Sequence, residues 1–270
     1  MKEMTLQDIQ AISLEIMQHF HEFCVAHDIK YSLGYGSLIG AIRHKGFIPW
    51  DDDLDVVMMR DDFERFCSIY EDTPEYKLFA FNRGNMYAAM GRLCDMKKTC
   101  VQTGSPLFTE QTGLWIDIFP LDSVDDDRAT FESKVAPIKE IQKKVLLSRW
   151  RMRPCPNILH IKSVLHWIYG RIRFKNDIEA EVKEQNNRCL SFASHDSKMM
   201  SLLVFPAYID RDFSPKYVFE EVIDAPFEDT QFKIMKGYDE WLTIIYGDYM
   251  TPPPIEKQKR GHSVHKYYLK

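Results

Sequence analysis

A run of carboxylates that leads directly into a buried strand constrains this chain more than any other feature. Four of the five residues at 51–55 are acidic, and the next four are apolar and typical of a buried strand. Side chains alternate along a strand, so Asp53 and Asp55 are expected on one face, about 7 Å apart. Two carboxylates this close repel each other unless a cation lies between them. The pattern therefore predicts a site for a hard cation, Mg²⁺ or Mn²⁺.

A glycine-serine turn precedes the acidic run. Residues 34–37 (GYGS) follow a short apolar stretch and lead into a helix expected at 38–43. The backbone N–H groups at such a helix start, together with the Ser37 hydroxyl, are suited to a phosphate. A third acid, Asp117, lies in another apolar stretch at 115–119 and is expected on a strand.

Two other interpretations of the acidic run were weighed. Acidic runs are most often solvated loops, but here the run enters a strand, follows a phosphate-type turn and is matched by a third strand-borne acid. An EF-hand loop is excluded, because Val56 stands where that loop needs glycine and Asp62 where it needs glutamate.

Composition excludes several classes of protein. The 45% hydrophobic content supports a core, and the net charge of −5 does not suggest a nucleic-acid partner. The six cysteines show no CxxC pairing, which favours reduced thiols over disulfides or a zinc site. No signal-peptide pattern and no apolar run of membrane-spanning length are found, which predicts a cytoplasmic protein.

Periodicity predicts an α+β fold. An amphipathic helix is expected first, capped by Thr5 with Asp8 three residues later. The other expected helices are 61–70, 124–152, 177–193 and 236–246. The expected strands are 31–33, 56–59, 76–81, 88–101 as a hairpin, 115–119, 202–209 and 218–223.

A basic segment interrupts this pattern. Residues 141–176 contain no acidic residue, whereas the nine basic ones there are Lys143, Lys144, Arg149, Arg151, Arg153, Lys162, Arg171, Arg173 and Lys175. Interleaved apolar residues are typical of a surface that lies on an anionic membrane. They are more typical of an insert that packs on the core with a solvated basic edge, and this is the favoured interpretation.

The segment GSLIGAIRHKGFIPWDDDLDVVMMRDDFERF resembles the signature of the LicD family of phosphocholine transferases, which includes relatives of fukutin. The similarity continues in GLWIDIFPLD and in YGDYMTPPP. The resemblance implies a nucleotidyltransferase fold: a mixed β-sheet core flanked by helices, with a helical basic insert and a C-terminal helical tail. The implied division is a catalytic core at 1–122, the insert at 123–199, and strands and a helix at 200–270 that complete the core.

The resemblance also implies a reaction. It is the Mg²⁺- or Mn²⁺-dependent transfer of phosphocholine from a CDP-choline-like donor to a hydroxyl of a cell-surface glycan, such as lipopolysaccharide or teichoic acid. Asp53, Asp55 and Asp117 would be catalytic, and the expected metal ligands are these three with Asp51. The expected substrate contacts are Gly36, Ser37, Arg43, His44, Arg92 and Asp95. Aromatic residues beside the motifs could hold the choline cation; the candidates are Tyr35, Trp50, Trp115 and Tyr249.

Several alternatives remain open at this point. The same fold serves nucleotidyltransferases and transferases of phosphoethanolamine or polyol phosphates, and it also occurs in non-catalytic nucleotide-binding relatives. A DxD glycosyltransferase is disfavoured, because a long opening helix replaces the βαβ unit that fold needs before its DxD. Asp117 would either complete a second metal site or accept the proton of the attacking hydroxyl. The basic segment leaves open a location at the inner face of the membrane.

Overall fold

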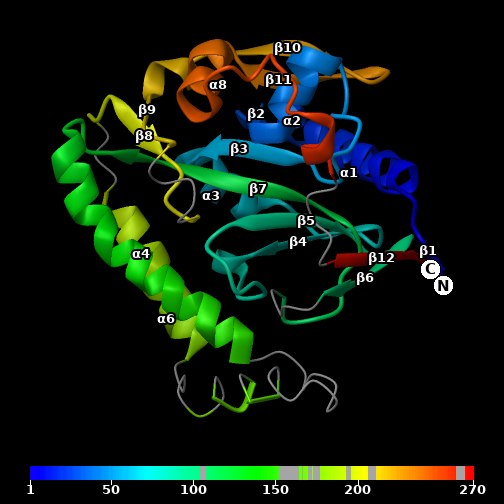
Figure 1. The fold of residues 1–270 in the computed structure, drawn as a ribbon, viewed down its shortest axis with the longest axis horizontal. Coiled ribbons are helices and arrows are strands. Elements are labelled where there is room, and N and C mark those ends of the chain that lie inside the picture. Colours follow the sequence, from blue (N-terminus) through cyan, green and yellow to red (C-terminus); the bar gives the residue numbers. More distant parts are fainter. Residues whose placement is uncertain are drawn as a thin grey trace.

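The computed structural model describes residues 1–103, 108–151, 164–165, 167–169, 172, 177–192, 196–205, 211–259 and 265–270. A mixed β-sheet lies at the centre, with helices on both faces (Figure 1). This arrangement confirms the predicted α+β class. The strands follow the spatial order β2 (Ser32–Leu33), β3 (Asp55–Met59), β7 (Trp115–Val124), β5 (Gly91–Asp95) and β4 (Tyr76–Ala80). Strand β7 also pairs with β8 (Met199–Ser201), which in turn pairs with β9 (Ser214–Pro215).

The register of the three central strands determines which residues meet. Strands β3 and β7 run parallel, with Asp55 opposite Asp117. Strand β5 runs antiparallel to β7, and Arg92 stands opposite the same Asp117. Since directly opposite residues in a sheet project to the same side, these three side chains share one face.

Two helices cover the other face. Helix α1 (Leu6–Ala26) begins at the predicted capping box of Thr5 and Asp8. It packs against α3 (Arg60–Ile69), where the rings of Phe20 and Phe66 lie 5.1 Å apart. Both helices contact β7.

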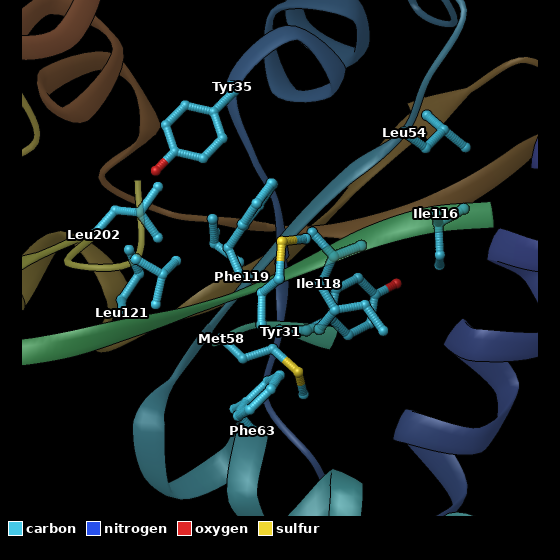
Figure 2. Packing of buried hydrophobic residues seen from close by; sticks show 14 of the residues in the cluster. Tyr31, Tyr35, Leu54, Met58, Phe63, Ile116, Ile118, Phe119, Leu121 and Leu202 are labelled. Carbon is cyan, nitrogen blue, oxygen red and sulfur yellow. The ribbon is translucent and has the colours of Figure 1, made fainter. Parts of the chain in front are cut away.

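Helix α2 (Tyr35–Ile39) lies on the face that carries Asp55 and Asp117, and a π-helical turn, Gly40–His44, follows it. The Tyr35 ring of α2 lies 5.9 Å from the ring of Phe119 on β7, an edge-to-face contact seen in Figure 2. Phe119 is two residues beyond Asp117, so it projects to the same side. Helix α2 therefore packs beside the acidic residues.

The C-terminal elements are built onto this core. The hairpin of β10 (Val222–Phe227) and β11 (Thr230–Met235) crosses the top of the view in Figure 1, and the helix α8 (Tyr238–Tyr246) lies beside α2. Strand β12 (His265–Leu269) pairs with β1 (Lys2–Glu3) and with β6 (Thr99–Thr103), which brings the two termini side by side. Three short 3₁₀ turns complete the order: Phe81–Arg83, Lys216–Phe219 and Ile255–Lys257.

Helices α4 (Arg128–Arg151) and α6 (Ile178–Ser191) pack against each other at one side of the sheet (Figure 1). Asp177 caps α6 by accepting hydrogen bonds from the backbone N–H groups of Glu179 and Ala180. Most of the basic segment between these helices lies outside the described residues. Within the described part of the chain, no helix combines the length and the apolar character that a membrane crossing requires.

Several predicted boundaries were wrong. Strands β5 and β6 follow each other but do not pair, so 88–101 is not a hairpin. Residues 202–205 are not a strand, and 206–209 lie outside the described residues. Residues 216–219 form a 3₁₀ turn after Pro215 rather than a strand. Short apolar runs do not distinguish strands from other buried segments, which explains the errors at 202–205 and 216–219. Helix α3 begins at Arg60, so Asp61 and Asp62 lie in its first turn rather than at its cap.

Candidate functional site

Three carboxylates converge at the start of the two parallel strands. The ligand oxygens of Asp53, Asp55 and Asp117 all lie within 4.8 Å of one another. The parallel register places Asp55 beside Asp117, and the backbone N–H of Asp117 donates to the Leu54 carbonyl at 2.9 Å. The sequence prediction that these three acids belong together therefore agrees with the geometry.

A second group of carboxylates shares Asp53. The oxygens of Asp51, Asp52 and Asp53 also lie within 4.8 Å of one another. Sequence reasoning missed Asp52, which is only 1% exposed, because strand alternation would point it away from its neighbours. The residues before β3 are not yet in strand conformation, so alternation does not apply there. The Gln10 side chain of α1 donates to the Asp51 carbonyl at 2.9 Å and holds this loop.

Electrostatic repulsion is strong at the site. Burial, followed by the nearby carboxylates of Asp53, Asp117 and Asp51, raises the pKa of Asp55 well above its ordinary value, although Arg92 opposes this effect. A divalent cation would remove the repulsion. Carboxylate oxygens are the ligands that Mg²⁺ and Mn²⁺ prefer, so the donor set fits such an ion.

The glycine-serine turn lies directly against the acids. The Ser37 hydroxyl accepts a hydrogen bond from the backbone N–H of Asp55 at 2.8 Å, and the Gly34 N–H donates to the Asp55 carbonyl at 2.9 Å. A Cβ atom on Gly36 would lie 2.9 Å from an Asp51 carboxylate oxygen, so a side chain there would displace that carboxylate. The Ser37 hydroxyl proton remains available for an acceptor such as a phosphate oxygen.

Arg92 connects the site to the sheet. Its Nε donates to Asp117 Oδ1, and its guanidinium lies 4.3 Å from the centre of the Trp115 ring. The side chain is 10% exposed, and its Nη1 has no hydrogen-bond partner among the described residues. A buried guanidinium nitrogen without a partner is costly, so its presence beside the carboxylates calls for an explanation.

The remaining predicted substrate contacts have protein partners. Arg43 donates from Nη1 to the Tyr249 carbonyl at 2.6 Å and from Nε to His44 Nε2 at 2.9 Å. Burial and the charge of Arg43 lower the pKa of His44. Phosphate binding by Arg43 would have to use its other N–H groups, and it stays a prediction.

Asp95 has a structural role in the turn between β5 and β6. Its Oδ2 accepts from the backbone N–H of Thr99 at 2.7 Å and from the Thr99 hydroxyl at 2.5 Å. It also accepts from the backbone N–H of Lys98 at 3.0 Å. The predicted substrate contact of Asp95 stays a prediction that none of these contacts supports.

The four aromatic candidates for choline differ in exposure. Tyr35, Trp115 and Tyr249 are buried, and Arg92 covers one face of Trp115. Trp50 is half-buried, with its ring 6.3 Å from that of His44. Among these four residues, Trp50 is therefore the one placed to meet a ligand.

Comparison with known proteins agrees with this geometry. The family profile described as "LicD/FKTN/FKRP, nucleotidyltransferase domain" matches residues 28–155. The chain is also 32% identical to the lipopolysaccharide cholinephosphotransferase LicD of Haemophilus influenzae, in an alignment that covers 100% of both chains. The chain belongs to the LicD family. The resemblance noted in the sequence is thus confirmed.

Two further relatives are named only as uncharacterised proteins. A protein of Rickettsia typhi is 34% identical over 34% of this chain and 30% of its own length. A protein of Rickettsia prowazekii is 34% identical over 37% of this chain and 35% of its own length. The family profile spans the glycine-serine turn, all five acids of the site and Arg92. The C-terminal elements that pack on α2 lie outside that range.

Proposed function

We propose that this LicD-family protein transfers phosphocholine from a CDP-choline-like donor to a hydroxyl group of a cell-surface glycan. The observation that carries the proposal is the convergence of the carboxylates of Asp53, Asp55 and Asp117 beside a glycine-serine turn. The full-length relationship to a lipopolysaccharide cholinephosphotransferase supports the substrate class.

Asp53, Asp55 and Asp117 would hold Mg²⁺ or Mn²⁺, with Asp51 and the newly identified Asp52 as further candidate ligands. When bound, the ion would neutralise the charge of the donor diphosphate and polarise its phosphorus–oxygen bonds. Gly36 and Ser37 would hold a donor phosphate through backbone N–H groups and the serine hydroxyl. These groups would align the donor so that the glycan hydroxyl oxygen bonds to the phosphorus of the choline phosphate, the bond from that phosphorus to the bridging oxygen breaks, and CMP leaves. The hydroxyl proton would pass to water or to a phosphate oxygen.

Asp117 fits the role of a metal ligand better than that of a base. Its ion pair with Arg92 engages one carboxylate oxygen and fixes the orientation of the side chain, which suits a metal ligand. A general base would instead need to accept a proton readily during the reaction. Arg92 therefore holds Asp117 in place, and its unpartnered Nη1 is a candidate donor to a phosphate oxygen of the substrate.

The proposal predicts selective stabilisation by one class of donor. Thermal unfolding would be followed with CDP-choline, CDP-ethanolamine, CDP-ribitol and UDP-glucose, each with Mg²⁺ or with EDTA. CDP-choline at one hundred times its Kd should stabilise the protein by about 2.7 kcal/mol, only with Mg²⁺. Turnover with a glycan acceptor should release CMP.

Other outcomes would identify the alternatives. A larger shift with CDP-ethanolamine or CDP-ribitol would assign a different substituted phosphate, and release of diphosphate would indicate nucleotide transfer. No Mg²⁺-dependent shift with any donor, and no CMP release, would contradict the proposal and favour a non-catalytic relative. The matched control is Asp229→Asn, which removes an exposed carboxylate from the β10–β11 turn and should leave all shifts unchanged.

We further propose that the chain divides into a catalytic core at 1–122, an insert at 123–199 and a C-terminal part at 200–270 that completes the core. Contacts of the C-terminal part support this division. The backbone N–H of Met235 on β11 donates to the Ser32 hydroxyl on β2 at 2.8 Å, and β12 pairs with β6.

The described part of the basic segment favours contact with a membrane surface. Helical residues Leu165, Ile168, Tyr169 and Ile172 have exposed fractions of 60%, 41%, 58% and 67%. Their spacing of three, four and seven residues places them on one helical face. The surrounding sequence at 141–176 contains nine basic residues and no acidic one. We propose that this face lies on anionic lipid, where a membrane-linked glycan precursor would be presented.

Vesicle binding tests this proposal. The protein should co-sediment with vesicles that contain phosphatidylglycerol but not with pure phosphatidylcholine vesicles. The double variant Ile168→Asp/Ile172→Asp should lower binding at least tenfold, since each isoleucine contributes on the order of 1.5–3 kcal/mol when buried. Ile255→Asp, at another exposed isoleucine, is the control and should bind normally. Equal binding of the double variant and the wild type would show that this helix face does not contact the lipid.

A further inference from the structure

A buried carboxylate links the C-terminal part of the chain to the glycine-serine turn. Asp212 has no exposed surface. Its Oδ2 accepts a hydrogen bond from the Tyr35 hydroxyl at 2.6 Å, and its Oδ1 accepts one from Trp241 Nε1 at 3.0 Å. The rings of Tyr35 and Trp241 lie 5.1 Å apart. Asp212 thus joins α2 to α8 at a single point in the core.

Tyr35 occupies a demanding position in the turn. It is the first residue of α2, and its φ of 45° lies in the left-handed region, which residues other than glycine rarely adopt. Such a conformation costs on the order of 1–3 kcal/mol and persists only where its surroundings enforce it. In Figure 2 the ring extends from α2 toward Phe119 and Leu202, with its hydroxyl at the end distant from α2. The bond to Asp212 fixes that hydroxyl.

The groups on either side of Tyr35 are those that contact the acids. Gly34 donates to the Asp55 carbonyl, and Ser37 accepts from the Asp55 N–H. Gly36 leaves the space that the Asp51 carboxylate occupies. A rotation of the backbone at Tyr35 would therefore move the phosphate-facing groups and Asp55 together.

Stability alone does not explain this carboxylate. Burial raises the pKa of Asp212 to about 7, although hydrogen bonds from Tyr35 and Trp241 pull it down. The core therefore holds a carboxyl group that is costly to ionise, and its hydrogen-bond donors, which include Tyr35 and Trp241, are neutral. An apolar side chain of similar size is often at least as stabilising as a buried charged group. The geometry that Asp212 imposes on Tyr35 is a reason for a carboxylate at this buried position.

We propose that Asp212 is a positioning residue for phosphoryl transfer: through the Tyr35 hydroxyl it holds the left-handed residue that sets the geometry of the glycine-serine turn and Asp55. This inference rests on the proposed function for its kinetic readout. It assigns a role in that reaction to a residue outside the segment that the family profile matches.

Two substitutions disrupt this link in different ways. Tyr35→Phe deletes the hydroxyl and keeps the ring, whereas Asp212→Asn keeps the volume but replaces one acceptor oxygen with an NH₂ donor, so that the side chain can no longer accept from both Tyr35 and Trp241. Each should lower kcat by roughly tenfold to a hundredfold, because small misplacements of reacting groups have effects of this size. The double variant should have a kcat no lower than that of the less active single variant, since both changes affect the same interaction. Asp212→Asn should not lower the unfolding midpoint at pH 8, because it removes a buried charge.

Tyr217→Phe is a matched control. The Tyr217 hydroxyl donates to Glu240 at 2.6 Å, the same kind of bond at the same length, but on the surface. Its loss should change kcat by less than twofold. Folded Tyr35→Phe and Asp212→Asn variants with kcat within twofold of the wild type would overturn the inference. A loss of activity fully explained by a smaller folded fraction would also overturn it.

A metal titration separates this inference from the proposed function. If the wild type transfers no phosphocholine, the proposed function fails, and Mn²⁺ affinity measured by calorimetry decides the inference. Displacement of Asp55 should weaken Mn²⁺ binding at least threefold in Tyr35→Phe and Asp212→Asn relative to Tyr217→Phe. Equal affinities in all three variants would show that the link does not position the acids.

Discussion

Replacing Asp55 with asparagine is expected to lower kcat roughly a thousandfold while it stabilises the metal-free protein. The loss corresponds to about 4 kcal/mol of transition-state stabilisation, a magnitude typical of a lost metal ligand. The metal-free variant is more stable because the Asp55 carboxylate, which repels three other carboxylates when no cation is bound, has been removed. The variant should fold normally, since asparagine has nearly the same shape and can still accept a hydrogen bond.

The pH dependence of unfolding tests the electrostatic part of this prediction. The folded-state pKa of Asp55 is raised, so the metal-free folded protein binds more protons than the unfolded chain above the ordinary carboxyl pKa. The contribution of Asp55 to the free energy of unfolding must therefore fall as the pH rises from the ordinary carboxyl pKa to the raised pKa of Asp55. Urea unfolding in EDTA between pH 4 and pH 8 should show a shallower decline for Asp55→Asn than for the wild type.

Metal binding supplies the complementary measurement. Because the ion requires the ionised carboxylate, the Mg²⁺ affinity of the wild type should rise with pH and binding should release protons. Asp229→Asn again serves as the control, because its carboxylate is exposed and distant in sequence from the site. Turnover of Asp55→Asn near the wild-type rate, or an unchanged pH slope, would contradict the assignment of Asp55 as a ligand.

The sequence predicted the acids because their pattern is local. Alternation placed Asp53 and Asp55 together, and an apolar context placed Asp117 on a strand. The pattern could not give the parallel register that sets Asp55 opposite Asp117, because strand order depends on contacts between distant segments. Asp52 was missed because the side-chain alternation of a strand was assumed for residues that precede the strand.

Long-range contacts account for most of the other misses. Tyr35 and Asp212 are separated by 177 residues, and nothing near Asp212 in the sequence indicates a partner in the glycine-serine turn. No strand was predicted at 265–269, yet β12 forms there and pairs with both β1 and β6. The substrate contact of Asp95 stays a prediction, and the sequence did not indicate that its carboxylate also caps the turn between β5 and β6.

Loss of the buried ion pair between Arg60 and Asp122 is expected to have the largest effect on stability. Two nearly parallel hydrogen bonds join them, Nε to Oδ1 at 2.7 Å and Nη2 to Oδ2 at 2.8 Å, and both side chains are buried. Arg60→Met should lower the free energy of unfolding by about 3–5 kcal/mol, because it leaves an uncompensated buried carboxylate. Urea unfolding measures this change directly.

The surface pair of Arg188 and Glu184 provides the control. These residues are one helical turn apart and exposed, so Arg188→Met should cost less than about 0.5 kcal/mol. The double variant Arg60→Met/Asp122→Leu should recover much of the loss, since it removes both charges. A cost below about 1 kcal/mol for Arg60→Met would show that Asp122 finds another partner or solvent.

The location of this pair also ties stability to the site. Arg60 follows β3 directly, and Asp122 lies on β7 five residues after Asp117. The ion pair therefore joins the ends of the two strands whose other ends carry Asp55 and Asp117, and it favours the register that brings those carboxylates together. The double variant distinguishes the two contributions. Recovered stability with a normal Mn²⁺ affinity would show that backbone pairing alone keeps the register, whereas recovered stability with weakened Mn²⁺ binding would show that the ion pair specifies it.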